Sequence, residues 1–542
     1  MTITDPSKEA VKRVGESAVP DAVAAIDIGT NSIHLVVANL GANGTMQILD
    51  TDKVTLRLGQ AIGPNNNISE EAIARVVETM RHMKEIAAAY PSNIRAVATH
   101  ATRVASNHER LLHSIKDATG IEVEVIDGVE EARLSFLGMR YGLNLHQILS
   151  MGIDVGGGST ELIIARGEDI RFVTSLKLGA VVLTKKFFGE KSPGKSDIKD
   201  LEEYVSDRLA PLEKDVKKLG LERAVVASGT AKALALVVAR FRKQEAPRDI
   251  NGYIISKEDL SKAVDWLSDL KDPQKIREET GLDAARSEII LAGGIIIERL
   301  AKHFGLKFIM VSSFGLREGI VVDTVTRQHG VGTSEHDDVR WTGIRDFMGR
   351  LQLDESYAQH VAQLALWIFD GTYSLVARKS EKADGASRLT ARELLKGAAL
   401  LHEVGRFLSY SRYHRHSAYL IANSSLLGFT QNEKYFMGMI ARFHRKGVPT
   451  AGSEGMEVLS SKDIDRLQVL SACLRMAVAM NRTRQGRVKA LLFRADKDVL
   501  DIVMQHEMGD YPEVEMHMVH RERSVLEKAF GFKLAFRTEA KS

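Results

Sequence analysis

The sequence predicts an α/β fold over residues 22–328, an all-helical domain over 329–485 and a small α+β module over 486–542. In the first part, short β-branched runs alternate with helical stretches, which is typical of a buried sheet covered by helices. Hydrophobic residues in the middle part recur at three- and four-residue spacing, which indicates helices. A segment that repeats within the α/β part indicates two homologous halves, 22–134 and 135–328.

Composition places the chain among ordinary globular proteins. Its 542 residues exceed what one core holds and predict roughly three or four domains. Hydrophobic residues make up 44% and charged residues 27%, so the chain is neither disordered nor fibrous. The net charge of +3 gives no general attraction to nucleic acid or anionic lipid, so neither is expected as a partner.

Other features predict a cytoplasmic protein. Cys473 is the single cysteine and cannot form an intramolecular disulfide, which fits a reducing compartment. Residues 1–21 are polar, lack the apolar core of a signal peptide and are expected to form a flexible tail. No run reaches the roughly eighteen apolar residues of a membrane span, because the longest, at 289–301, contains Gly-Gly and charged residues.

The repeat places AIDIGTNSIHLVVA, from Ala25, over GIDVGGGSTELIIA, from Gly152, without a gap. Each copy predicts a strand, an aspartate, a glycine-rich turn with hydroxyl side chains and a second strand. Such a turn can bring backbone N–H groups against a phosphate, because glycine tolerates a close approach. Two facing copies would bind one polyphosphate from both sides.

The two copies differ at one chemically important position, where the first has His34 and the second Glu161. Glu161 is expected beside the turn, within reach of Asp154. Two carboxylates next to a phosphate loop suit Mg²⁺ coordination and the orientation of water. The alternatives are that Glu161 caps an exposed strand face, and that Asp27 and Asp154 stabilise their own turns.

A third glycine-hydroxyl element, Ser228-Gly229-Thr230, lies between a predicted strand and a predicted helix. Free N–H groups and the helix dipole make such a junction an anion site, although a serine here is also an ordinary N-cap. No GxxxxGK[ST] loop is present, which disfavours a P-loop enzyme; residues 156–158 lack the GxGxxG spacing and precede a predicted strand, which argues against a Rossmann fold.

The motifs AIDIGTNSIHLVVA, THATR, EVIDGVEEARLSFLG, IDVGGGSTELII, ASGTAKAL and SSFGLREGI occur in this order. Together they resemble the exopolyphosphatase and guanosine pentaphosphate phosphohydrolase family, within the actin, sugar-kinase and heat-shock-chaperone ATPase superfamily. The segments LLHEVGRFLSYSRYHRHSAYLIANSSLLGF and ARFHRKG resemble the helical third domain of its long, four-domain members. The resemblance implies two actin-like (ribonuclease H-like) domains, an HD-like helical domain and a homodimer.

The resemblance also implies roles for matching positions. Glu131, the second glutamate of EEAR, would be the general base that deprotonates the attacking water, and Glu130 is the weaker candidate. Arg103 would bind phosphate, and Asp154 and Glu161 would bind Mg²⁺ and orient the water, with K⁺ as a further candidate ion. The implied phosphate contacts are Thr30, Asn31, Ser32, Gly157, Gly158, Ser159, Thr160, Ser228, Gly229 and Thr230.

Two positions depart from the family pattern. Asp127 replaces the usual serine before the glutamate pair, so its carboxylate either raises the pKa of the base or lies outside the site. The family's Ser-Asp-Gly is here Ser313-Phe314-Gly315, which puts any role of that aspartate in doubt.

In the helical domain, LLHEVGRF carries His402-Glu403 where the HD signature has His-Asp, so a second metal centre is expected to be lost. His402, His414, His416 and His444 then pack or cap. Locally basic sequence still predicts a polyphosphate track, although most basic clusters are solvated faces. The track would be lined by Arg412, His414, Arg415, His416, Arg442 and Arg445.

The expected function is that of an exopolyphosphatase, which releases terminal orthophosphate from inorganic polyphosphate by Mg²⁺-assisted attack of a water activated by Glu131. The alternative is hydrolysis of the γ-phosphate of pppGpp in the same site, because both substrates end in a phosphoanhydride. A sugar or acetate kinase of the same superfamily is disfavoured because Glu131 occupies the position of the family's hydrolytic base and no separate sugar-binding signature is present. A non-catalytic sensor is disfavoured because Glu131, Asp154 and Glu161 are retained.

Overall fold

The structure is a computed structural model. It describes residues 22–541 apart from 41–44, 64, 146, 190–191, 248, 330–338, 377–384, 425, 427 and 497–498. The expected tail, residues 1–21, lies outside the described residues. The described residues form two compact units, unit 1 within 1–246 and 254–336 and unit 2 within 247–253 and 337–542. Across the described ranges, no helix combines the length and the apolar character that crossing a membrane requires.

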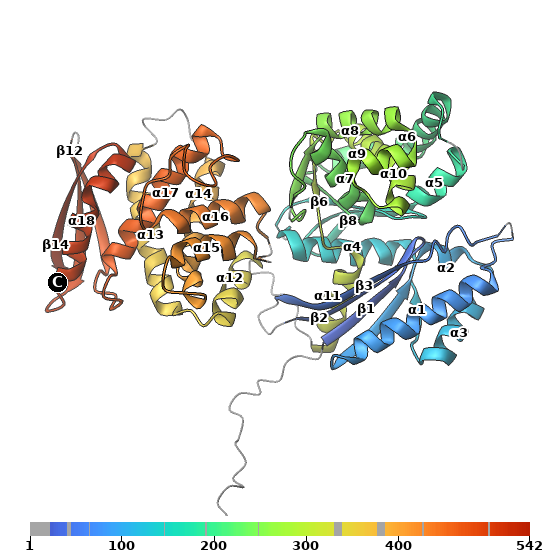
Figure 1. Ribbon diagram of the computed structural model, residues 1–542, viewed down its shortest axis with the longest axis horizontal. Helices are drawn as coiled ribbons and strands as arrows, with labels where there is room; N and C mark the ends of the chain where they lie inside the picture. Colours follow the sequence, from blue (N-terminus) through green and yellow to red (C-terminus); the bar gives the residue numbers. More distant parts are fainter. Residues whose placement is uncertain are drawn as a thin grey trace, which may run out of the picture. The chain divides into compact units, whose positions relative to one another are not determined.

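The first sheet of unit 1 has the strand order β3-β2-β1-β4-β5 (Figure 1). β1 and β2 are antiparallel and pair Asp27 with His34, whereas β4 and β5 continue the sheet in parallel. β1 is buried almost throughout, as expected for a central strand covered on both faces. The elements are β1 (Ala22–Ile28), β2 (Ser32–Leu40), β3 (Met46–Thr55), α1 (Glu70–Ala88), β4 (Ser92–Ala98), α2 (His100–Val104), α3 (His108–Thr119) and β5 (Val123–Val125).

The second sheet repeats this arrangement, because its order β8-β7-β6-β9-β11-β10 places equivalent strands at equivalent positions. β6 and β7 pair Asp154 with Glu161, in the register of Asp27 and His34, so the predicted duplication is present in the fold. The strands are β6 (Ser150–Val155), β7 (Thr160–Arg166), β8 (Asp169–Leu176), β9 (Arg223–Ala227), β10 (Tyr253–Ser256) and β11 (Phe308–Val311). The helices are α5 (Ala180–Phe187), α6 (Lys195–Lys218), α7 (Gly229–Phe241), α8 (Lys257–Leu270), α9 (Pro273–Thr280) and α10 (Ala284–His303).

Two further helices of unit 1, α4 (Gly128–Leu143) and α11 (Leu316–His329), cross each other closely. A Cβ added to Gly138 would lie 2.1 Å from the carbonyl oxygen of Gly315, and one added to Gly319 would lie 1.8 Å from that of Leu134. α4 packs on the second sheet and α11 on β1 and β2 of the first. The expected boundary between residues 134 and 135 therefore falls inside a continuous helix, and the helix after the second sheet returns to the first.

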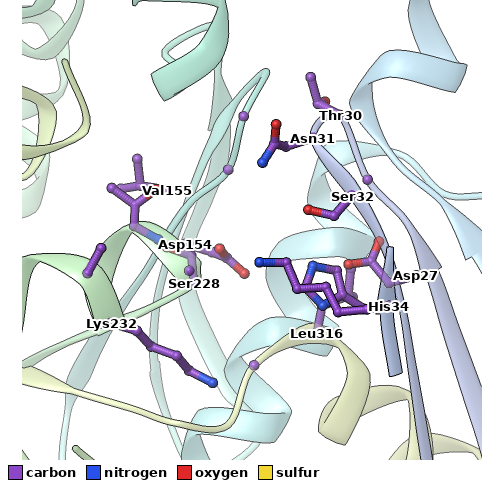
Figure 2. A pocket seen from close by; sticks show the side chains of 18 of the residues that line it. Asp27, Thr30, Asn31, Ser32, His34, Asp154, Val155, Ser228, Lys232 and Leu316 are labelled. Atoms are coloured by element: carbon purple, nitrogen blue, oxygen red, sulfur yellow. Dashed lines mark hydrogen bonds between the residues drawn. The ribbon is translucent and has the colours of Figure 1, made fainter. Parts of the chain in front are cut away.

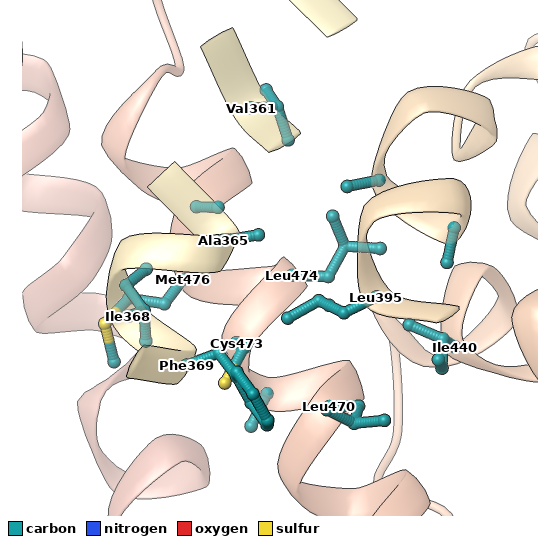
Figure 3. Close-up of a cluster of buried hydrophobic side chains, with 14 of the residues drawn as sticks. Val361, Ala365, Ile368, Phe369, Leu395, Ile440, Leu470, Cys473, Leu474 and Met476 are labelled. Atoms are coloured by element: carbon teal, nitrogen blue, oxygen red, sulfur yellow. The ribbon is translucent and has the colours of Figure 1, made fainter. Parts of the chain in front are cut away.

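Unit 2 is helical and closes with a three-stranded sheet of order β12-β13-β14. One hydrophobic core runs from Ile344 to Phe536 and contains the buried Cys473 (Figure 3). The helical domain and the C-terminal module, expected as separate domains, thus share a core, because α13 packs on β12 and α17 on α18. The elements are α12 (Val339–Arg350), α13 (Glu355–Val376), α14 (Gly385–Leu401), η2 (Val404–Phe407), α15 (Tyr413–Ala422), α16 (Gln431–Phe443), α17 (Ser461–Met480), β12 (Ala490–Asp496), β13 (Val499–Glu507), α18 (Glu513–Phe530) and β14 (Lys533–Lys541).

Candidate active site

A cleft of about 820 Å³ lies within unit 1, between the turns of the two hairpins. Both turns line it, together with the start of α7 and the start of α11. Figure 2 shows Asp27 and His34 of the first sheet facing Asp154 of the second sheet and Lys232 of α7 across this space. The repeat therefore brings its two chemically distinct copies to opposite walls of one cavity.

The two turns have the same backbone hydrogen bond. Gly29 N donates to Ser32 O over 3.1 Å, and Gly156 N donates to Ser159 O over 2.9 Å. The turns also approach each other, since a Cβ on Gly157 would lie 3.1 Å from Thr30 Cβ. The predicted phosphate contacts that line the cleft are Thr30, Asn31, Ser32, Gly157, Gly158, Ser159, Ser228, Gly229 and Thr230.

Thr160 departs from this group. It is buried, it does not line the cleft, and its hydroxyl donates to the carbonyl oxygen of Leu178. The repeat equates it with Ile33, which is also buried, because both side chains face the core side of their strands. The predicted phosphate contact of Thr160 is thus replaced by a structural hydrogen bond.

Ser228 fulfils the N-cap role that was its ordinary interpretation. Its Oγ accepts hydrogen bonds from Thr230 N at 3.1 Å and Ala231 N at 3.3 Å. Its backbone has a φ of 101°, a conformation that non-glycine residues rarely adopt and that costs energy. Gly229 lies next to it, and the guanidinium of Arg286 packs against its Cα, because a Cβ there would lie 2.0 Å from a guanidinium nitrogen of Arg286.

Four carboxylates lie in or next to the cleft; Glu131 and Glu161 are buried, and Asp27 and Asp154 are half-buried. Burial, with the charge of Asp154 contributing, raises the pKa of Asp27 to about 7 and that of Glu161 to about 7. Burial also raises the pKa of Asp154, which accepts a hydrogen bond from Ser135 Oγ at 2.5 Å. Glu131 is 8% exposed, and burial followed by the charge of Glu161 raises its pKa well above the ordinary value. Protons are therefore exchanged here at a pH near neutrality.

Glu131 is held by Arg103, whose Nη1 donates to Glu131 Oε2 at 3.2 Å and to Ile126 O at 2.6 Å. The guanidinium opposes the rise in the pKa of Glu131. Asp127 lies outside the cleft lining and caps α4, accepting from Val129 N and Glu130 N. Of the two interpretations left open for Asp127, the structure matches the one that places it outside the site.

A cationic wall, missing from the sequence prediction, completes the cleft. It consists of Lys53 on β3, Lys232 on α7, Arg286 on α10 and Arg317 on α11. Burial lowers the pKa of Lys53, Lys232 and Arg286. Burial and the surrounding cations, Arg317 foremost, lower the pKa of His34 to about 2, so its ring is neutral. Converging, partly desolvated cations indicate a site for an anion of high charge.

The profile of the Ppx/GppA phosphatase family matches residues 36–328, and that of the family's domain III matches residues 339–514. The chain belongs to the Ppx/GppA phosphatase family. It is accordingly a hydrolase that acts on phosphoanhydride bonds.

Relatives of this family resemble the chain along most of its length. The guanosine-5'-triphosphate,3'-diphosphate pyrophosphatase of Vibrio vulnificus is 30% identical over 465 residues, which are 85% of this chain and 87% of that protein. The protein of the same name from Aliivibrio fischeri is 28% identical over 493 residues, which are 90% of this chain and 92% of that protein.

Solved structures match a little more than half of the chain. An exopolyphosphatase from Cytophaga hutchinsonii has 27% identity and a TM-score of 0.53, covering 58% of this chain and 99% of its own. The Ppx/GppA family member of Aquifex aeolicus has 28% identity and a TM-score of 0.50, and the match covers 57% of this chain and 99% of that protein.

Among the residues that the structure describes, no group of three or more His, Cys, Asp or Glu side chains has the geometry of a metal site. Mg²⁺ needs only one or two carboxylates when phosphate oxygens and waters complete its shell. Asp27 Oδ1 and Glu161 Oε2 are buried without a hydrogen-bond partner, and both belong to the group of four carboxylates. This donor set fits a Mg²⁺ ion whose remaining ligands come from a Ppx/GppA substrate.

The residues of the expected polyphosphate track lie on unit 2, at the start of α15 and the end of α16. His414 is only 7% exposed, and burial together with surrounding cations lowers its pKa to about 4. Arg442 pairs with Glu454 at 2.7 Å, and Arg445 lies over the ring of Tyr413. Arg412 and Arg415 are exposed, and His416 is half-buried. The cations are thus neighbours, but they do not form one open row.

His402 and His444, two of the four histidines for which packing or capping roles are expected, have partners inside unit 2. His402 Nδ1 lies 2.7 Å from Ala399 O, and Tyr413 Oη lies 3.1 Å from His444 Nε2. Glu403 pairs with Arg406 and Arg484. These contacts agree with the expected packing roles.

Proposed function

We propose that the cleft hydrolyses the terminal phosphoanhydride bond of pppGpp. The observation that carries this proposal is that one cavity holds two kinds of anion-binding group, the glycine-rich hairpin turns and the cationic wall. pppGpp carries two separate anionic groups, a 5'-triphosphate and a 3'-diphosphate. The names of the relatives that cover most of the chain support the same substrate. We therefore place pppGpp before polyphosphate, the reverse of the order expected from the sequence.

In this proposal Glu131 is the general base. Burial and the charge of Glu161 raise its pKa, which makes the ionised carboxylate a stronger base than that of a free glutamate. Arg103 orients Glu131 and offers its remaining N–H groups to the phosphoryl oxygens. Backbone N–H groups of the two turns hold the terminal phosphate in line with the water.

Asp154 and Glu161, with Asp27 beside them, would hold Mg²⁺, which when bound supplies positive charge to the phosphate oxygens. Without a bound cation, Asp27 and Glu161 would be ionised only in part near pH 7, because the pKa of each is raised to about 7. Water exclusion by the buried walls strengthens each of these charge interactions.

Inorganic polyphosphate is the second candidate substrate. The exopolyphosphatase of Cytophaga hutchinsonii matches 58% of the chain at 27% identity, and a linear polyphosphate also presents a terminal phosphate with further charges behind it. The cationic wall would then bind the following phosphates. The track on unit 2, the HD-like assignment, the homodimer and the cytoplasmic location stay predictions.

Orthophosphate release from pppGpp and from polyphosphate by Glu131→Gln and Glu130→Gln tests the proposal. Glu130 is the matched control, because it is the preceding residue of α4 and pairs with Arg133 at 2.7 Å. Loss of the base should lower kcat by about 100- to 10,000-fold, whereas Glu130→Gln should keep nearly full activity. Equal activities of the two variants would rule out Glu131 as the base.

A further inference from the structure

We propose that His100 is a phosphate contact of the active site, whose imidazole N–H donates a hydrogen bond to the terminal phosphoryl group bound at Gly157 and Gly158. The inference rests on the proposed function, because it assigns a donor to the reacting group of that substrate. Nothing in the repeat or the glycine turns marks His100, which precedes Arg103 by three residues.

The strand and helix that flank His100 position it at the cleft. It is the first residue of α2, directly after β4, and the preceding Thr99 N donates to Ile28 O at the end of β1 over 3.1 Å. The ends of the two parallel strands therefore fix the start of α2 beside the first hairpin turn. His100 lines the same cavity as Glu131 and Ser159.

The ring lies against the opposite turn, on the second sheet. A Cβ on Gly158 would be 2.1 Å from His100 Cδ2, 2.6 Å from Cγ and 3.0 Å from Nε2. The other side of this turn is equally close to Gly179, where a Cβ would lie 2.3 Å from Gly157 O. The turn is thus held between His100 and Gly179, and the imidazole borders the backbone expected to receive the phosphate.

The charge state of His100 suits a donor that stays uncharged. Burial, together with the charges of Arg103 and Lys177, lowers the pKa of His100 to about 4. At neutral pH the ring therefore carries one N–H and one lone pair. A preorganised N–H beside a developing phosphoryl charge stabilises the transition state without a change of protonation.

Three variants test this contact by orthophosphate release. His100→Ala removes the donor, His100→Gln keeps an N–H near the position of Nε2, and His113→Ala is the control, since His113 is exposed on α3. A lost hydrogen bond to a charged group should lower kcat/KM by about ten- to a hundredfold in His100→Ala. Glutamine should restore most of the loss, and added imidazole should partly rescue His100→Ala. Equal activities of His100→Ala and His113→Ala would overturn the proposal.

A purely steric role predicts a different pattern. In that case neither His100→Gln nor added imidazole would restore activity. The double variant Gly158→Ala/His100→Ala would then be as active as the wild type, because His100→Ala removes the ring that the new Cβ at position 158 would otherwise contact. That combination of results would also overturn the proposal. The expected result is that the double variant regains its fold but keeps the tenfold or larger deficit of His100→Ala.

Binding of orthophosphate, followed by titration calorimetry, separates this inference from the proposed function. We expect the Kd for orthophosphate to rise about tenfold or more in His100→Ala relative to His113→Ala, whether or not the wild type hydrolyses pppGpp. If His100→Ala binds orthophosphate more weakly but the wild type does not hydrolyse pppGpp, the proposed function is wrong and the phosphate contact of His100 is still supported. An unchanged Kd would exclude the contact itself.

Discussion

Arg103 Nη1 donates a hydrogen bond to Glu131 Oε2 over 3.2 Å. Arg103 belongs to α2, beside the first sheet, and Glu131 belongs to α4, which packs on the second sheet. The contact joins the two halves of unit 1 at the position of the proposed base. The guanidinium opposes the rise in the pKa of that carboxyl, so a phosphate bound by Arg103, as proposed above, would be coupled to the protonation of Glu131.

Arg103→Gln should therefore change the pH profile as well as the rate. Without the guanidinium the pKa of Glu131 rises, so the acid limb of kcat/KM moves to higher pH. We expect kcat/KM at neutral pH to fall by about a hundredfold from the lost charge-assisted bonds. Arg110→Gln is the control, since Arg110 is exposed on α3 and pairs with Glu70. An acid limb that does not move would contradict the coupling.

Asp27→Asn should stabilise the protein at alkaline pH. Burial raises the pKa of Asp27 from 3.8 to about 7, so between these values the folded state binds a proton that the unfolded state has lost. The free energy of unfolding accordingly falls as pH rises from about 4 to 7, by on the order of 4 kcal/mol, and stays low above that.

Thermal unfolding at pH 5 and pH 8 checks this sign. Asp27→Asn should raise Tm at pH 8, flatten the pH dependence and abolish phosphate release, if Asp27 helps to hold Mg²⁺. Asp117→Asn, at an exposed position on α3, should leave Tm and activity unchanged. A lower Tm of Asp27→Asn at pH 8 would show that the buried carboxylate is stabilising there.

Lys232→Met should reduce the preference for pppGpp over GTP. Both nucleotides end in a triphosphate, but GTP lacks the 3'-diphosphate that the cationic wall is proposed to bind. We expect kcat/KM for pppGpp to fall by about tenfold or more and that for GTP by much less. The exposed Lys185→Met on α5 serves as the control. Equal losses on both nucleotides would place Lys232 along the 5'-phosphates instead.

Gly319→Ala should destabilise unit 1. A methyl group there would lie 1.8 Å from Leu134 O, so α4 and α11 must separate, which we expect to lower the free energy of unfolding by about 1 to 3 kcal/mol or more. Gly63→Ala in the same unit meets only Asn67 O at 3.8 Å and should be nearly neutral. Denaturant unfolding of the two variants measures the difference. Similar midpoints would show that the helix crossing can adjust freely.

The internal repeat made much of unit 1 predictable. It equated Asp27 with Asp154 and His34 with Glu161, and the strand registers have the same equivalences. It also held information that the prediction did not use, since Thr160 corresponds to the buried Ile33. Asp127 three residues before Glu130 has the spacing of a helix-capping pair, which accounts for its position at the start of α4.

The cationic wall was not predictable in the same way. Lys53, Lys232, Arg286 and Arg317 are far apart in the sequence, and each by itself is typical of a solvated surface position. Only the packing of β3, α7, α10 and α11 around one cleft brings them together. The shared core of unit 2 escaped prediction for the same reason, because the apolar faces of α13 and α17 do not reveal which elements will cover them.

Hydrolysis of pppGpp in H₂¹⁸O with Mg²⁺, followed by mass spectrometry of the products, tests the central claim most directly. If Glu131 activates a water that attacks the terminal phosphorus, ¹⁸O enters the released orthophosphate and the ppGpp product stays unlabelled. Label in ppGpp, or release of pyrophosphate in place of orthophosphate, would contradict attack at the terminal phosphorus in this cleft.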